Sequence, residues 1–153
     1  MDFERVELDA QHYLYVDREC PYGPEIGKAM ESAFKELFGF VGQSGITPLA
    51  APMAVYVAMD PDILRFRGAV IVEAGDAALA TGSIKADTLP AGPVMKGMHV
   101  GGYGEIGTSH QALWAHIEEK GLTAKMPVWE IYIDDPFDVA EEALRTEIYR
   151  AIG

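Results

Sequence analysis

The sequence predicts an α+β fold, in which two strand–helix–strand–strand units form an antiparallel sheet with both helices on one face. Two observations predict it. The 153 residues are 49% hydrophobic and 24% charged, a composition typical of a single folded domain with a substantial core. Short motifs also recur in the same order in the two halves of the chain, which indicates an internal repeat.

Three short motifs define this repeat. Glu25-Ile26-Gly27 recurs as Glu105-Ile106-Gly107, Val55-Tyr56-Val57 resembles Ile131-Tyr132-Ile133, and Asp60-Pro61 matches Asp135-Pro136. Two copies are too few for a solenoid, so they should pack as one unit. We therefore predict one domain over residues 1–153, with internal repeats at approximately 1–77 and 82–153.

The first half of the chain contains the signals of one helix and three strands. Pro24 suits the first turn of a helix, and apolar residues recur at helical spacing from Ile26 to Leu37, with Gly39 as the expected stop. Runs of β-branched and aromatic residues predict the strands. The predicted strands are His12–Asp17, Pro52–Met59 and Phe66–Glu73.

The second half repeats this order. A glycine-rich turn, Gly101–Gly104, precedes a helix whose apolar stripe runs from Ile106 to Ile117 and which ends near Gly121. The turn lacks the Lys and Ser/Thr of a phosphate-binding P-loop. The predicted strands are Val94–Val100, Val128–Ile133 and Leu144–Tyr149, and the stretch 74–91 between the halves is expected to be loop with a short strand.

The charge balance excludes some partners. The chain has 24 acidic and 12 basic residues, a formal net charge of −12, and this surface repels a phosphate backbone. The N-terminus lacks the pattern of a signal peptide, and no apolar run approaches the roughly 18 residues of a membrane span. We expect a cytoplasmic protein with no direct contact to nucleic acid or membrane.

The cysteine and the histidines predict neither a metal site nor a cofactor. Cys20 is the single cysteine, so an intrachain disulfide is impossible. His12, His99 and His116 show no metal-ligand spacing. His110 lies on the apolar stripe of the second helix and is expected to be a structural histidine.

Glu130 is the exceptional residue of the second half, because the other residues of Val128–Ile133 are apolar or aromatic. Strand alternation places Glu130 and Tyr132 on one side and Trp129 and Ile131 on the other. The counterparts of the Glu130 side in the first half are Ala54, Tyr56 and Ala58. We expect this side to face away from the helices and to form the floor of a ligand cleft, with the Trp129 side against the helices.

A buried carboxylate needs a partner, because desolvation penalises its charge. A ligand cation or the hydroxyl of a tyrosine would meet this need at Glu130. The alternation also permits a plain alternative, in which this side is wet and Glu130 is an ordinary outward residue.

With these residues in place, the chain resembles the GyrI-like small-molecule-binding domains, also called AraC-type effector-binding domains. The strongest match is an aromatic-Glu-x-Tyr strand followed by Asp-Pro and a closing Thr-Glu-Ile strand. The matching segments are Leu89–Gly92, Gly102–Ile106, Leu113-Trp114, Gly121-Leu122, Trp129–Tyr132, Asp135-Pro136 and Leu144–Ile148.

The resemblance implies a pseudo-twofold fold with a ligand cleft where the two units meet, and Glu130 at the base of that cleft among aromatic residues. Some relatives sense lipophilic cations as parts of transcription regulators, while others hydrolyse cyclopropane-containing compounds or inhibit DNA gyrase. Both repeats together use up this sequence, so we expect a stand-alone member without a helix-turn-helix.

Three functions follow as hypotheses. The first is a stand-alone binding domain for apolar or cationic aromatic small molecules, in which Tyr56 and Tyr132 stack on the ligand and Glu130 pairs with its charge. The second is a hydrolase of strained-ring, cyclopropanoid electrophiles with Glu130 as general base. The third is a protein-interaction module, such as a gyrase inhibitor, whose acidic surface imitates a phosphate backbone.

Overall fold

The computed structural model describes all 153 residues, which form two compact units. The central unit comprises Ala10–Pro90, and the terminal unit comprises Met1–Asp9 together with Ala91–Gly153. Each unit has its own antiparallel sheet and its own helix, and each is described by itself.

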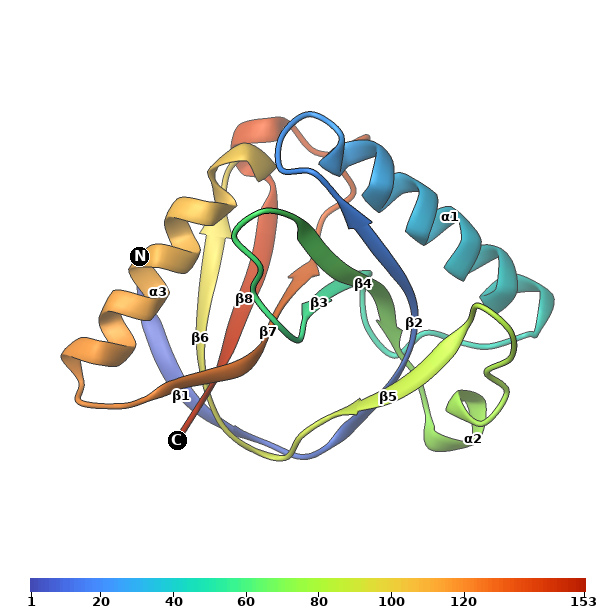
Figure 1. The fold of residues 1–153 in the computed structure, drawn as a ribbon, viewed down its shortest axis with the longest axis horizontal. Helices are drawn as coiled ribbons and strands as arrows, with labels where there is room; N and C mark the ends of the chain where they lie inside the picture. Colours follow the sequence, from blue (N-terminus) through green and yellow to red (C-terminus); the bar gives the residue numbers. More distant parts are fainter. The chain divides into compact units, whose positions relative to one another are not determined.

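The central unit is a four-stranded antiparallel sheet with one long helix (Figure 1). Its strand order is β5-β2-β4-β3, so the two strands that flank the helix in sequence are not neighbours. Its elements are β2 (Gln11–Cys20), α1 (Ile26–Gln43), β3 (Met53–Tyr56), β4 (Leu64–Ile71), the short α2 (Ala74–Ala77) and β5 (Lys85–Leu89).

The terminal unit has the same plan, with strand order β1-β6-β8-β7 and every pairing antiparallel. Helix α3 contacts β6, β7 and β8. Its elements are β1 (Phe3–Leu8), β6 (Gly92–Val100), the 3₁₀ turn η1 (Tyr103–Glu105), α3 (Ile106–Glu119), β7 (Ala124–Tyr132), the 3₁₀ turn η2 (Glu141–Ala143) and β8 (Arg145–Ile152).

The predicted α+β class is confirmed, and both units contain the predicted strand–helix–strand–strand order. The predicted stop of the first helix at Gly39 is wrong. Helix α1 continues because Val41 adds another buried residue to its core stripe, and the chain leaves the helix at Gly45, where φ is +68°. The second helix ends at Glu119, near Gly121 as predicted, and Gly121 has a φ of +73°.

Strand β1 was missed by the sequence analysis. Phe3–Leu8 alternates apolar and charged residues over a short span, and it is ordered by pairing with β6 along its whole length. The strand predicted over Pro52–Met59 ends at Tyr56, and Ala58 follows it in an exposed bend. The predicted short strand between the halves is β5, and the rest of that stretch includes α2.

Helix α1 packs closely on the central sheet. Its buried residues Ala33, Leu37 and Val41 recur every four positions and face β2 and β4. Gly68 of β4 permits the approach, because a Cβ atom at this position would lie 2.8 Å from Cβ of Ala33. The glycine is therefore required by packing between strand and helix.

Gly68→Ala should lower the free energy of unfolding by about 1–3 kcal/mol, because α1 must move away from β4 to admit a methyl group. Gly39→Ala is the matched control, since nothing lies within 4 Å of a Cβ at this helical position. This control should raise the stability by up to about 1 kcal/mol. Urea unfolding of both variants provides the test, and a Gly68→Ala protein as stable as the wild type would show that the contact is not restrictive.

Candidate functional site around Glu130

Glu130 lies near the end of β7, paired with Ile148 of β8, and only 4% of its surface is exposed. Its strand neighbours Trp129 and Ile131 are also buried. The carboxylate is therefore almost completely removed from solvent. The structure thus confirms that Glu130 is not an ordinary outward residue.

The Glu130 side of β7 faces α3. Nε2 of His110, on α3, lies 3.7 Å from Oε2 of Glu130, and Tyr132 packs against the core between α3 and the sheet. The predicted alternation of Glu130 and Tyr132 against Trp129 and Ile131 is therefore correct. The prediction that the Glu130 side faces away from the helices is wrong.

The physical reason is that both sides of β7 are buried. Trp129 stacks on Tyr149 of β8, with ring centroids 5.2 Å apart and an interplanar angle of 8°. Trp129 is 1% exposed, so the side opposite α3 also carries a large apolar residue. Hydrophobicity along the strand could not distinguish the side that α3 covers.

Two aromatic rings lie near Glu130 at this end of the terminal unit. The Tyr103 ring meets the Tyr132 ring edge to face, with centroids 5.5 Å apart at 67°. Burial raises the pKa of the Tyr103 phenol, and the negative charges of Asp135, Asp134 and Glu130 raise it further. Tyr103 therefore keeps its proton at neutral pH, and 41% of its surface is exposed.

A buried histidine fixes the turn that carries Tyr103. The Nδ1 atom of His99 lies 2.7 Å from Oγ of Ser109, and its Nε2 lies 2.9 Å from the carbonyl of Gly102. A carbonyl can only accept, so Nε2–H donates to Gly102, and Nδ1 is hydrogen-bonded to the Ser109 hydroxyl. The ring thereby ties β6 to the turn and to α3, and Ser109 is engaged in this structural contact.

Sequence reasoning did not place His110 and Tyr103 near Glu130. His110 was read as a structural histidine of the helix, and Tyr103 as part of a glycine turn. The available signal was helical spacing: residues three and four apart share one side of a helix, so His110 and Trp114 lie side by side along α3. This spacing does not reveal that His110 lies beside Glu130 of β7 and Trp114 beside Arg150 of β8.

The predicted first-half residues belong to the central unit. Ala54 is fully buried and pairs with Gly68, which faces α1, and Tyr56 packs against Ala33 and Phe66. This side of β3 therefore also faces its helix, contrary to the prediction. Ala58 is exposed beyond the end of β3, so the strand alternation does not extend to it.

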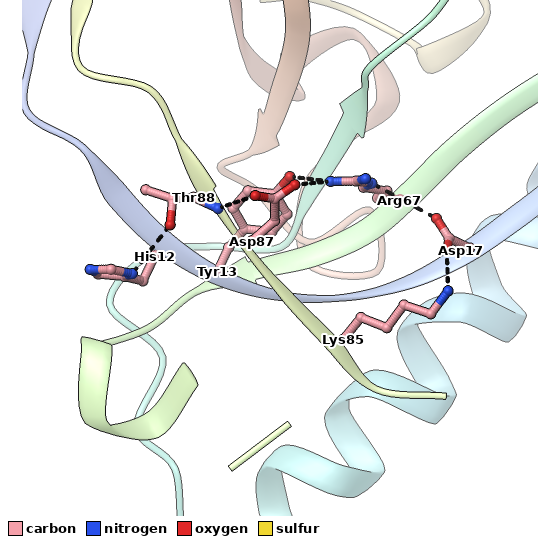
Figure 2. A network of polar contacts seen from close by, with 7 residues as sticks. All are labelled: His12, Tyr13, Asp17, Arg67, Lys85, Asp87 and Thr88. Carbon is pink, nitrogen blue, oxygen red and sulfur yellow. Dashed lines mark hydrogen bonds and ion pairs between the residues drawn. The ribbon is translucent and has the colours of Figure 1, made fainter. Parts of the chain in front are cut away.

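A second polar cluster joins strands of the central sheet through the side chains of His12, Tyr13, Asp17, Arg67, Lys85, Asp87 and Thr88 (Figure 2). The Arg67 guanidinium lies 4.1 Å from the centre of the Tyr15 ring and donates to the Tyr13 hydroxyl at 2.8 Å and to Asp87 at 2.6 Å. The Arg67 hydrogen bond holds the pKa of Asp87 below its usual value.

The remaining side chains of this cluster also contact one another. Lys85 donates to Asp17 at 2.9 Å, and Thr88 lies 3.4 Å from Nδ1 of His12 (Figure 2). These contacts join β5, β2 and β4 through their own side chains. We therefore assign the cluster a structural role in the sheet.

No three His, Cys, Asp or Glu side chains are grouped as a metal ion requires. No helix of this chain has both the length and the apolar character needed to cross a bilayer.

The comparison with known proteins agrees with this fold. The family model of the GyrI-like small molecule binding domain matches residues 1–152. The chain therefore belongs to the GyrI-like small-molecule-binding family. No curated protein matches the sequence.

Several solved structures share the fold. The C-terminal domain of EcmrR has a TM-score of 0.79 at 18% identity, with 99% of this chain and 97% of that chain covered. A hydrolase from Listeria innocua gives 0.64 at 18% identity, with 99% and 91% covered. SAV2435, solved with bound tetraphenylphosphonium, gives 0.64 at 15% identity, with 100% and 94% covered.

The match to EcmrR in a complex with DNA has a TM-score of 0.78 at 17% identity and covers 99% of this chain. This chain spans 57% of that EcmrR chain. At these identities the likeness concerns the fold.

Proposed function

We propose that this domain binds cationic aromatic small molecules, and that Glu130 pairs with the positive charge of the ligand. The observation that carries the proposal is a carboxylate that is 4% exposed and lies on the same side of β7 as Tyr132, with Tyr103 against that ring. The tetraphenylphosphonium bound to the similarly folded SAV2435 belongs to this class of ligand and supports the proposal.

The charge of Glu130 favours a cation over a neutral ligand. Burying a carboxylate costs free energy, and a cation that enters the site recovers part of this cost. The faces of Tyr103 and Tyr132 add cation–π attraction, which amounts to roughly 0.5–2 kcal/mol for each ring. A neutral molecule of the same shape gains only the apolar contacts.

His110 can pair with Glu130 when it is protonated, since its Nε2 lies 3.7 Å from Oε2 of Glu130. This distance is longer than a hydrogen bond, and the two groups are held on different elements, α3 and β7. A ligand cation would therefore compete with His110 for the carboxylate. The proposed contacts are therefore Glu130, Tyr103 and Tyr132 of the terminal unit. Ala54 and Tyr56 lie on the side of β3 that faces α1, and Ala58 lies beyond the end of β3, so these three predicted contacts are not included.

The test compares tetraphenylphosphonium with the neutral triphenylphosphine oxide by isothermal titration calorimetry. Glu130→Gln should weaken binding of the cation by about tenfold or more, since the Coulomb attraction between a cation and a buried carboxylate a few ångströms apart amounts to roughly 1.4 kcal/mol or more. The affinity of the variant for the neutral oxide should stay within about twofold of the wild-type affinity, because only the charge has been removed.

Glu119→Gln on the exposed end of α3 is the matched control, with the same change of net charge. It should leave both affinities unchanged. If the cation binds no better than the oxide, or if Glu119→Gln weakens it as much as Glu130→Gln, the charge-pairing role of Glu130 is wrong.

The hydrolase hypothesis uses the same carboxylate. Glu130 would take a proton from water as the water oxygen bonds to a strained-ring carbon, while the strained ring bond at that carbon breaks and its electron pair takes a proton from a nearby tyrosine hydroxyl. A mass increase of one water in a cyclopropanoid electrophile, dependent on Glu130, would favour hydrolysis over simple binding.

A further inference from the structure

Arg150 of β8 is a half-buried cation without an acidic partner. Its Nε atom is buried and makes no hydrogen bond. The guanidinium carbon of Arg150 lies 5.1 Å from the centre of the Trp114 ring. Burial lowers the pKa of the Arg150 guanidinium. The other five arginines all form salt bridges with carboxylates: Arg5, Arg18, Arg65, Arg67 and Arg145.

This isolation is unexpected in a chain with a net charge of −12. Acidic residues outnumber basic residues two to one, so a partner for Arg150 could arise at many positions. A buried charge without a partner destabilises the folded state. The Arg150 site is therefore suited to an anion that comes from outside the chain.

Trp114 supplies a flat apolar surface beside this cation. It lies one turn after His110 on α3 and contacts Arg150 of β8, and 48% of its surface is exposed. The core under α3 is filled by Leu113 and Ile117, so Trp114 is not needed to complete it. A half-exposed indole that contacts a guanidinium can also stack on an aromatic ligand.

The strand register relates this pair to Glu130. Val128 pairs with Arg150 and Glu130 pairs with Ile148, so Arg150 is diagonal to Glu130 on the same side of the sheet. Diagonal neighbours in a sheet are about 7–8 Å apart. A small molecule could therefore reach one of these groups without covering the other.

We propose that Trp114 and Arg150 form a second binding subsite, which takes a carboxylate carried on an aromatic ring. The carboxylate pairs with the terminal nitrogens of the guanidinium, because Nε is covered, and the ring stacks on the exposed face of Trp114. The subsite is independent of the proposed cation binding at Glu130, since it uses a charge of opposite sign on different residues.

The experiment follows the Arg150 Nε–H resonance by NMR during titration with 2-naphthoate or with the neutral 2-naphthamide. The carboxylate should shift this resonance in a saturable way and bind about tenfold tighter than the amide, because only the carboxylate pairs with the guanidinium. Equal binding of both compounds, or no saturable shift with 2-naphthoate at millimolar concentration, would overturn the proposal.

Variants separate the two halves of the subsite, with binding followed through backbone amide resonances. Arg150→Gln should abolish the preference for the carboxylate, and Trp114→Ala should weaken both compounds. Arg65→Gln, which removes an exposed arginine of the central unit, is the matched control and should change neither affinity. A loss of the preference in the Arg65→Gln protein as large as in Arg150→Gln would contradict the assignment.

Glu130→Gln distinguishes this subsite from the proposed function. Removing a nearby negative charge should raise the affinity for 2-naphthoate by up to about threefold, while it lowers the affinity for tetraphenylphosphonium. If tetraphenylphosphonium fails to bind but 2-naphthoate still shifts Arg150, the cation site is wrong and the Trp114–Arg150 subsite stands. If Glu130→Gln weakens 2-naphthoate as strongly as the cation, the two subsites are not distinct.

Discussion

Replacing Trp129 by alanine should lower the free energy of unfolding by about 3–5 kcal/mol, the range expected when a large aromatic residue is removed from a core. Trp129 is 1% exposed and stacks on Tyr149 at 5.2 Å. Its removal loses this contact and leaves a cavity, because the paired strands β7 and β8 restrict how far their side chains can collapse.

The control for this prediction is Trp114→Ala, the same substitution at a position that is 48% exposed. It should cost less than about 1 kcal/mol, since much of the indole already contacts water. Urea unfolding followed by circular dichroism measures both variants. Equal losses of stability would mean that Trp129 is not the packing residue that its burial indicates.

Stability should also fall steeply at alkaline pH, chiefly because of Tyr13. Burial of this phenol raises its pKa from the ordinary value of 10.0 to about 12, although the hydrogen bond from Arg67 and its positive charge act in the opposite direction. Between pH 10 and 12 the unfolded chain releases the Tyr13 proton while the folded protein keeps it. The folded state then binds more protons, so its stability decreases as the pH rises.

The stabilisation from Tyr13 is thus fully present below about pH 10 and is lost as the pH rises through about 12, in total on the order of 3 kcal/mol. Tyr13→Phe should remove this part of the loss when unfolding is measured from pH 9 to 12. A smaller loss should remain, because burial also raises the pKa of Tyr149. A variant whose stability falls as steeply as that of the wild type would exclude Tyr13 as the cause.

Local signals made the secondary structure largely predictable. The stripe from Ile26 to Leu37 predicts a helix because an apolar face at this period can be buried only in that conformation. Its end was placed wrongly, because Gly39 can either stop a helix or remain inside it. The choice depended on Val41, whose burial against the sheet favours about one further turn, to Gln43.

Strand β1 shows that local sequence signals can also miss a whole element. Glu4, Arg5 and Glu7 make the segment look like a polar terminus, and its apolar residues are too few to indicate a buried strand by themselves. The backbone of β6, far along the chain, supplies the hydrogen bonds that order it. Pairing between distant segments leaves little trace in the local composition of either one.

The sequence by itself determined the α+β class and singled out Glu130, because a carboxylate in an apolar strand is costly wherever that strand is buried. It also determined that Tyr132 shares a side with Glu130, since alternation follows from the strand backbone alone. Only the tertiary structure decided that this side faces α3, and that His110 and Tyr103 lie beside it. Alternation fixes which residues share a side of a strand, whereas the side that a helix covers depends on how distant apolar surfaces pack together.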